Sequence, residues 1–385
     1  MSIFNLTKSI KLSKDFKALS LHHCIVALSS GMFGLFLPIF LLKEFGNSVY
    51  WVLLFYLSGY FLYAFTAPLG AMLMQRVGSK RVMIIARFFN VAFYVSLYFL
   101  RYNPLLFAIL ANLNLVLFRT LYWVPYHVEF TRFTNGKYRG RQMAYLAILG
   151  YLIGVGAPLL AGFLLMQGSF ELLFILAVLI LMISILPLKR LSHQEIKFDF
   201  SYKQTFQELF QRKHRRLRAA YFSDGAQGLV GIIIWPIFIY QLLDGQYLAM
   251  GAVTALVVIA TVICQLMVGG YTDKVSKKKM MKVGSLIYAI GWVAKMFVAT
   301  VFQIFVAGTF HSLAYIAFRT PFDAFSYEKF ADSGSYVDEY TVLREISSNL
   351  GRATMGLFLL ALVALVGIKV AFPVAAVFSL FINVF

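Results

Sequence analysis

Two arginines lie deep inside long apolar segments, at positions 119 and 319. Each is the centre of the same tripeptide, Phe118-Arg119-Thr120 in the first half and Phe318-Arg319-Thr320 in the second. A guanidinium is planar, permanently charged and able to hold a carboxylate or phosphate through two parallel hydrogen bonds. A charge within a membrane helix costs about 2.5–3.5 kcal/mol on insertion scales, so such residues usually serve a function. The pair therefore predicts a binding site for an acidic group.

Further polar and aromatic side chains follow both arginines at helical spacing. In a helix, Tyr315 and Asp323 would lie one turn on either side of Arg319, and Tyr122 and Trp123 would lie next to Arg119. The predicted substrate-binding residues are Arg119, Arg319, Asn112, Tyr122, Trp123, Tyr126, Tyr315 and Trp235. A structural alternative stays open, in which Asp323 only neutralises Arg319 or an arginine extends its charge to the membrane surface.

Several acids and one histidine are candidates for proton coupling, because such groups near a cavity mouth change charge with their surroundings. They are Asp323, Asp224, Glu129 and His127. The alternative is that these residues mark hydrated cytoplasmic helix ends. Lys295 and Arg87 are expected to extend to the outer and inner membrane surfaces.

The elements that must position these residues are membrane-spanning helices. Charged residues make up only 13% of the chain, against about 25% in a soluble domain. The apolar runs are continuous and about 20 residues long, which favours helices over the alternating strands of a β-barrel. We expect an all-α integral membrane protein with spans at 20–42, 49–74, 82–100, 104–127, 143–166, 172–188, 220–242, 248–270, 280–300, 303–326, 341–364 and 368–385.

The net charge of +19 is distributed as in a multi-pass membrane protein. With the N-terminus in the cytoplasm, 27 of the 35 Lys and Arg residues fall in inner segments. The outer loops contain only Lys43, Arg101 and Lys369. This asymmetry follows the positive-inside rule and predicts a cytoplasmic membrane protein with a cytoplasmic N-terminus and central loop. The asymmetry accounts for the excess of basic residues, so nucleic acid is not expected as a partner. The expected partners are membrane lipids and a small-molecule substrate. We expect the protein to be a monomer.

The sequence contains no pattern typical of an enzyme. We find no cluster of metal ligands, no nucleophile–base pair and no phosphate-binding loop, so neither a cofactor nor a metal is expected. Cys24 and Cys264 lie inside apolar runs and are interpreted as small core residues.

A short polar segment occurs twice and divides the chain into two similar halves. It runs from 71 to 81 and again from 269 to 279, which is the same offset, within two residues, as that of the arginine tripeptides. A repeat of this length in an apolar chain is typical of transporters built from two helical halves. We predict a basic tail at 1–18, a six-helix bundle at 19–188, a cytoplasmic linker at 189–218 and a second bundle at 219–385.

The repeated segment resembles the loop G-x-L-x-D-[RK]-x-G-[RK]-[RK] of the major facilitator superfamily, which follows helices 2 and 8 of that family. The first copy matches it at Leu73, Arg76, Gly78 and Lys80, and departs from it at Ala71 and Gln75. The second copy matches at Gly269, Asp273, Lys274, Lys277 and Lys278, with Ser276 in place of glycine. Arg139-Gly140-Arg141, followed by Gly150, Gly154, Pro158 and Gly162, is similar to the family's R-G-R loop and helix 5.

The resemblance implies two pseudo-symmetric six-helix bundles around a cavity lined by helices 1, 4, 7 and 10. It also implies charge pairs that close the cytoplasmic side, with Asp273 facing the start of helix 5 and Arg76 and Lys80 facing the start of helix 11. The expected lock residues are Arg76, Gly78, Lys80, Asp273, Lys274, Lys277, Arg139, Arg141 and Glu345. The alternative is that these charges only set topology. The glycines of helix 5 are expected to permit close helix packing.

The combined interpretation is a secondary transporter that moves a small organic solute by alternating access. The arginines favour an anionic solute, and symport or antiport with protons stays open. A broad-specificity drug/proton antiporter is the nearest alternative. A lipid flippase or a non-transporting membrane scaffold is the alternative from another class.

Overall fold

The computed structural model describes residues 13–133, 139–192, 198–272, 277–331 and 337–384. Within these ranges the protein is helical and contains no strand. The longer helices in the first half are α2 (Lys14–Gly34), α3 (Leu37–Glu44), α4 (Val49–Val77), α5 (Ser79–Tyr98), α6 (Pro104–Phe133), α7 (Arg139–Gln167), α8 (Phe170–Ile183) and α9 (Ile185–Leu188). The later helices are α10 (Tyr202–Phe210), α11 (Arg215–Leu229), α12 (Trp235–Leu242), α13 (Tyr247–Thr272), α14 (Lys277–Met296), α15 (Val301–Ala331), α16 (Val337–Val366) and α17 (Ala371–Phe381).

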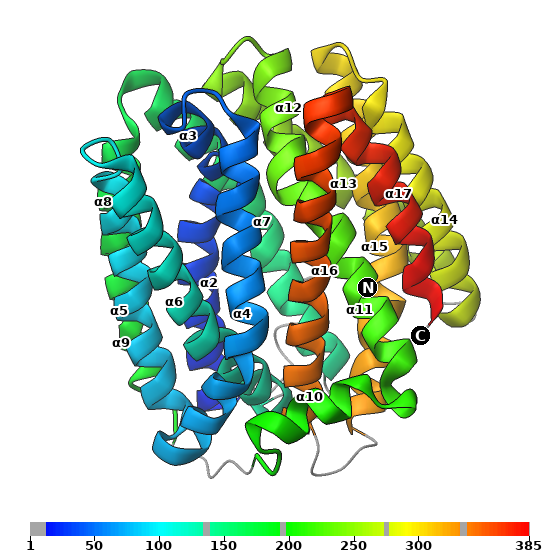
Figure 1. The fold of residues 1–385 in the computed structure, drawn as a ribbon. Helices are drawn as coiled ribbons and strands as arrows, with labels where there is room; N and C mark the ends of the chain where they lie inside the picture. The colour runs from blue at the N-terminus through cyan, green and yellow to red at the C-terminus, as the bar shows by residue number, and fades with distance from the viewer. Residues whose placement is uncertain (1–12, 134–138, 193–197, 273–276, 332–336, 385) are drawn as a thin grey trace.

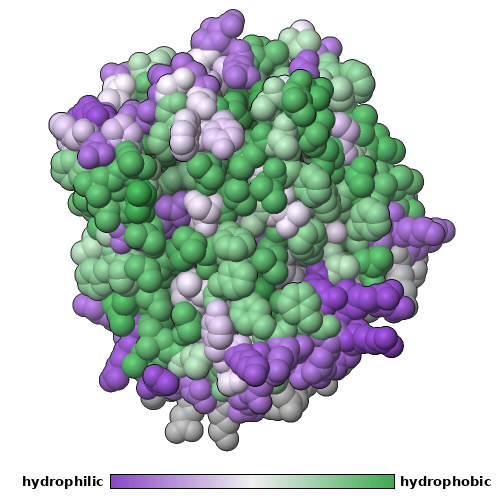
Figure 2. Space-filling view, viewed as in Figure 1, coloured by the Kyte–Doolittle hydropathy of each residue, from purple (hydrophilic) through white to green (hydrophobic). Residues whose placement is uncertain are grey.

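The length and composition of these helices suit a membrane. Among the described residues, nine helical segments are long and apolar enough to cross it, and α2 with α3, bent by 42°, forms a tenth. The two other expected spans, 280–300 and 368–385, correspond to α14, whose sequence includes several lysines, and to the shorter apolar segment Ile368–Val384. Figure 2 shows apolar side chains over the middle of the molecule and polar ones toward its two ends. The predicted all-helical membrane architecture is confirmed.

The two six-helix bundles meet along two pairs of helices. In Figure 1, α4 of the first bundle and α16 of the second run side by side. On another side α7 packs against α13. A Cβ added at Gly162 of α7 would lie 2.6 Å from the Tyr247 carbonyl oxygen, and one at Gly251 of α13 would lie 2.4 Å from that of Pro158. Gly162 therefore permits close helix packing, as expected from the sequence.

The end of the molecule that contains α10 is called the linker side here, and the end that contains α3 and α12 the far side (Figure 1). On the linker side, α10 begins at Ser201, whose side chain and that of Gln204 form a reciprocal capping box. The Tyr202 hydroxyl donates to the Phe65 carbonyl, and Phe206 stacks on the Phe65 ring. These contacts hold α10 against α4.

Contacts between the bundles occur at both ends of the molecule. On the linker side, Arg132 of α6 pairs with Asp338 of α16 at 3.0 Å, and the Tyr63 hydroxyl of α4 donates to Glu345. On the far side, the Lys43 ammonium donates to the Tyr247 hydroxyl at 2.9 Å. Side chains of the two bundles therefore contact each other on both the linker side and the far side.

Candidate functional site

A cavity of about 570 Å³ lies between the two bundles. Its wall comes from α2, α4, α5 and α6 in the first bundle and from α11, α15 and α16 in the second. The volume is within the range of sites for small molecules. Many lining side chains are aromatic, and the charged ones are Arg119, Arg319, Arg344, Arg352, Asp224, Asp323 and Glu345, with His127 beside them.

Arg319 is held between two carboxylates. Its Nη1 donates to Asp224 of α11 at 2.8 Å, and its Nε donates to Asp323, one turn further along α15, at 3.0 Å. Two acids thus share one guanidinium, which leaves this group of three with one surplus negative charge. Arg319 is occupied by the protein's own acids and offers less to a ligand than its sequence suggested.

A second charge cluster joins the bundles near the linker side. Arg344 donates to Glu345 at 3.0 Å, and the Tyr63 hydroxyl donates to the other carboxylate oxygen at 3.2 Å. The His127 Nε2 lies 3.8 Å from Glu345. Glu345 therefore connects α16 to side chains of α4 and α6.

Arg119 and Arg352 have different surroundings. The Arg119 guanidinium lies over the Tyr60 ring, 4.3 Å from its centroid, and that of Arg352 lies 5.3 Å from the same centroid. Neither guanidinium lies within 4 Å of a carboxylate in the described part of the chain. Nη1 of Arg119 and Nε of Arg352 are buried without a hydrogen-bond partner, and Arg352 Nη1 donates only to the Asn349 amide oxygen.

This arrangement places one under-satisfied guanidinium from each bundle on a single tyrosine ring of α4. A cation over an aromatic face is stabilised by about 0.5–2 kcal/mol, which is less than the cost of burying its charge. A carboxylate or another acidic group entering the cavity would provide the missing hydrogen bonds. The site is therefore suited to an anion that contacts both bundles at once.

The remaining first-half candidates face other neighbours. Trp123 lines the cavity, whereas Tyr122 is buried within the bundle, where its hydroxyl lies 3.1 Å from His22 Nε2. Tyr126 stacks on His23, with ring centroids 5.2 Å apart. The Asn112 amide donates to the Phe55 carbonyl and lines a lateral groove between α4 and α6. Glu129 is buried and accepts a hydrogen bond from Ser79.

Two basic residues lie deeper than their sequence positions suggested. The expectation that Arg87 and Lys295 extend to the membrane surfaces is wrong, because their exposed fractions are 0% and 4%. The Arg87 guanidinium lies 3.8 Å from the Tyr122 ring centroid. Lys295 lines a second cavity, in the second bundle, together with the predicted residues Tyr315 and Trp235. Both cations lie against aromatic faces.

The predicted lock residues are only partly described. Asp273 and Lys274 lie outside the described residues, and the side chains of Lys277, Arg139 and Arg141 do so as well. Gly78 adopts φ +86°, which allows the sharp turn between α4 and α5. Arg76 is exposed, and the Lys80 ammonium donates to the carbonyls of residues 189 and 191 rather than to an acid of α16. Asp338 pairs with Arg132 instead.

Three residues central to this geometry were not among the predicted site residues. Arg352 lies in an apolar segment with no acid three or four residues away, and this pattern could have singled it out. Tyr60 is one of 22 tyrosines and Arg132 one of 35 basic residues, so nothing in their local sequence distinguishes them. Only the packing of α4 and α6 against α16 brings them to the interface.

Comparisons with known proteins agree with this architecture. The family model described as Major Facilitator Superfamily matches residues 19–242 and again residues 219–385. A Bacillus subtilis (strain 168) protein described as "Uncharacterized protein YqgE" is 21% identical over 359 residues, which cover 91% of this chain and 83% of the relative. Among solved structures, the human organic anion transporter MFSD10 (TETRAN) superposes with a TM-score of 0.70 at 13% identity, over 98% of this chain and 100% of that one. At that identity the likeness concerns the fold.

Proposed function

Because this chain belongs to the major facilitator superfamily of secondary transporters, we propose that it moves a small organic anion across the cytoplasmic membrane. The observation that carries the proposal is the pair of guanidiniums, Arg119 and Arg352, that share the Tyr60 ring without an acidic partner in the described residues. The printed name of MFSD10 describes an organic anion transporter, which is consistent with this substrate class.

Alternating access follows from the position of this site between the bundles. An anion that contacts α6 and α16 together stabilises the state in which the bundles are close, and its release permits them to rock apart. The contacts Arg132–Asp338 and Lys43–Tyr247 would break in turn as each side opens. In our proposal the linker side is cytoplasmic, the protein acts as a monomer, and the Asp273 lock contributes to closure on that side.

The Asp224–Arg319–Asp323 group is our candidate for proton coupling. One guanidinium cannot fully compensate two carboxylates, so one acid is the natural site for a proton when solvent access changes. His127, 3.8 Å from Glu345, is a second candidate, because the opening of the cavity changes its contact with α16. Symport and antiport would use the same groups.

The alternative functions require a different charge in the cavity or a different route of entry into it. A broad-specificity drug/proton antiporter for lipophilic cations would need acids that are free to meet a cation. In the described part of the cavity, each carboxylate already contacts an arginine. A scaffold has no need of an open cavity of about 570 Å³, and a flippase needs lateral entry between the bundles, where α7 and α13 pack closely.

The test is binding and uptake by purified protein. Thermal shift should reveal stabilisation by organic anions, because a ligand stabilises the folded state by mass action. Proteoliposomes should accumulate the same anions, and the Arg119→Gln/Arg352→Gln double variant should lose both effects. Lys282→Gln, an exposed lysine on α14, is the control for loss of a positive charge. Stabilisation by lipophilic cations alone would contradict the proposal.

A further inference from the structure

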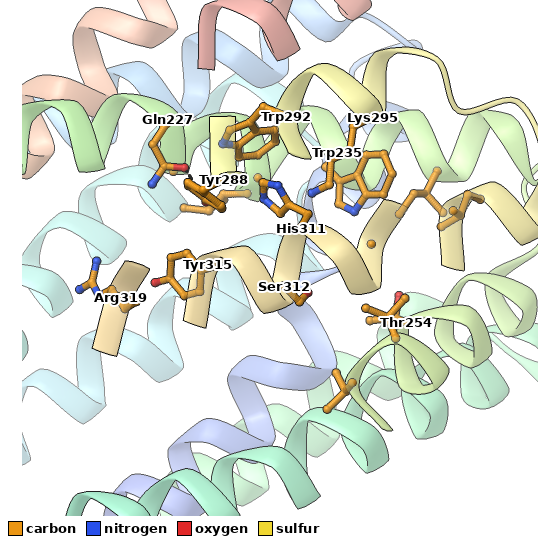
Figure 3. Close-up of a pocket in the computed structure, with 18 of the residues that line it drawn as sticks. Gln227, Trp235, Thr254, Tyr288, Trp292, Lys295, His311, Ser312, Tyr315 and Arg319 are labelled. Carbon is orange, nitrogen blue, oxygen red and sulfur yellow. Dashed lines mark hydrogen bonds between the residues drawn. The ribbon is translucent and has the colours of Figure 1, made fainter. Parts of the chain in front are cut away.

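The second cavity, of about 520 Å³, lies within the second bundle and adjoins the central one. The two cavities share the lining residues Asp224, Ile232, Arg319 and Arg352, so a molecule at the Arg352 guanidinium borders both. Figure 3 shows side chains along this second cavity, with Arg319 and Tyr315 at one end and Lys295 and Trp235 at the other.

Lys295 forms the charged end of this second cavity. Its ammonium lies 4.3 Å from the ring centroid of Trp235 and 4.5 Å from that of Trp292. Its side chain is buried, and the sole carboxylate among the described lining residues is Asp224, which Arg319 already holds. Two indole faces compensate a buried ammonium only in part, so an anion beside Lys295 would stabilise its charged form.

The side chains around Lys295 form a binding pocket rather than a packed core. His311 packs its ring against Trp292 at 4.3 Å between centroids, and Ser312 and Thr254 add hydroxyls to the wall. Val257 and Ile304 provide apolar contacts. A charged end beside an apolar wall is the usual composition of a site for an organic acid.

We propose that the Lys295 pocket binds a second acidic group of the transported anion, so that the preferred substrate is an elongated dianion. One acidic group would contact Arg119 and Arg352, the apolar body would follow Tyr315 and Val257, and the other acidic group would pair with Lys295. This inference rests on the proposed function and specifies its substrate class. The two acidic groups would be on the order of 10 Å apart. Arg319 lies at the end shared with the central cavity, and His311 packs on Trp292 beside Lys295. These two residues are eight positions apart on α15, and each residue of a helix rises about 1.5 Å.

The experiment compares straight-chain dicarboxylates of increasing length with the monocarboxylate of each length. Trp235 and Trp292 line the second cavity and Trp123 lines the central one, so tryptophan fluorescence responds to occupation of either cavity. Calorimetry gives the affinity and stoichiometry. Wild-type protein should bind the best dicarboxylate about 10–100-fold more tightly than its monocarboxylate, as expected for one added charge-assisted interaction. The advantage should pass through a maximum with length, because the two cationic ends are fixed.

Variants at Lys295 isolate the second acidic group. Lys295→Gln should abolish the advantage of the dicarboxylate over its monocarboxylate. Lys295→Arg should retain the advantage, and Lys282→Gln, the same substitution at an exposed position of α14, should behave as wild type.

The outcomes separate this inference from the proposed function. If no carboxylate binds, the proposed function fails and this inference fails with it. If monocarboxylates bind but dicarboxylates have no length-dependent advantage in wild-type protein, the second pocket is not part of the substrate site. An advantage that survives Lys295→Gln would also overturn it.

Discussion

Arg119 and Arg319 occupy the same position of the internal repeat, yet their electrostatic surroundings are opposite. Arg319 is bound by Asp224 and Asp323, whereas Arg119 lies on Tyr60 with a buried, unpartnered nitrogen. The repeat offset of 200 residues makes Cys24 the equivalent of Asp224 and Trp123 the equivalent of Asp323, so the first half has no acid at either position. The duplication thus preserves where an arginine lies but not what neutralises it, and one copy is free for a ligand while the other is held in place.

The largest effect on stability should come from removing Arg319, the arginine that is held by two of the protein's own acids. Arg319→Ala leaves Asp224 and Asp323 close together without a cation, and should lower the free energy of unfolding by about 3 kcal/mol, as for breaking a partly buried ion pair. Thermal unfolding in detergent measures this loss. Adding Asp224→Asn and Asp323→Asn should restore most of it, and an unstable triple variant would argue that packing, not charge, explains the defect.

The contrast can be removed by giving Arg119 an acid at the position equivalent to Asp323. Trp123→Asp should form an i,i+4 ion pair and weaken organic anion binding about tenfold, which is about 1.4 kcal/mol. Trp123→Asn loses the same ring without adding charge and is the matched control. Equal affinities for the two variants, measured by calorimetry, would contradict the view that Arg119 is available because it lacks an acid.

The Tyr60 ring under Arg119 and Arg352 should contribute less to stability than Arg319 does. Tyr60→Leu removes the ring face under Arg119 and Arg352 and should reduce stability by about 0.5–2 kcal/mol, while Tyr60→Phe retains the ring and should remain close to wild type. Thermal unfolding without ligand measures the difference. If the Phe variant is as unstable as the Leu variant, the hydroxyl rather than the ring face is the supporting group.

An ion pair outside the membrane should show the smallest effect. The Lys213 ammonium, 2.7 Å from Glu208, lowers the pKa of that carboxyl by hydrogen bonding. The folded-state pKa lies below the unfolded one, so the stabilisation is present at neutral pH and disappears as pH falls through the folded-state pKa. Glu208→Gln should cost less than about 0.5 kcal/mol at pH 7, because the Lys213 partner is exposed to solvent, and nothing in strong acid. Denaturant unfolding at the two pH values checks this difference.

The sequence was sufficient for the fold because apolar length, charge asymmetry and an internal repeat are all local or additive properties. It was less informative about the site. Periodicity correctly placed Asp323 one turn from Arg319, but Asp224 comes from another helix and its distance to Arg319 depends on how α11 packs. The contact of Arg352 with Tyr60 likewise crosses between bundles. Arg87 and Lys295 were misplaced because Tyr122 and Trp235, whose rings lie against them, come from other helices.

The i,i+4 spacing of Arg319 and Asp323 also bears on how the chain enters the membrane during synthesis. An arginine near the centre of an isolated helix costs about 2.5–3.5 kcal/mol to insert. In α15 the counter-ion belongs to the same helix, so the charge can be neutralised before any other helix is present. In α6 the group that covers Arg119 is Tyr60 of α4, which the ribosome makes first. Cover for Arg119 therefore depends on α4 being made before α6, whereas α15 itself contains Asp323, the counter-ion of its arginine.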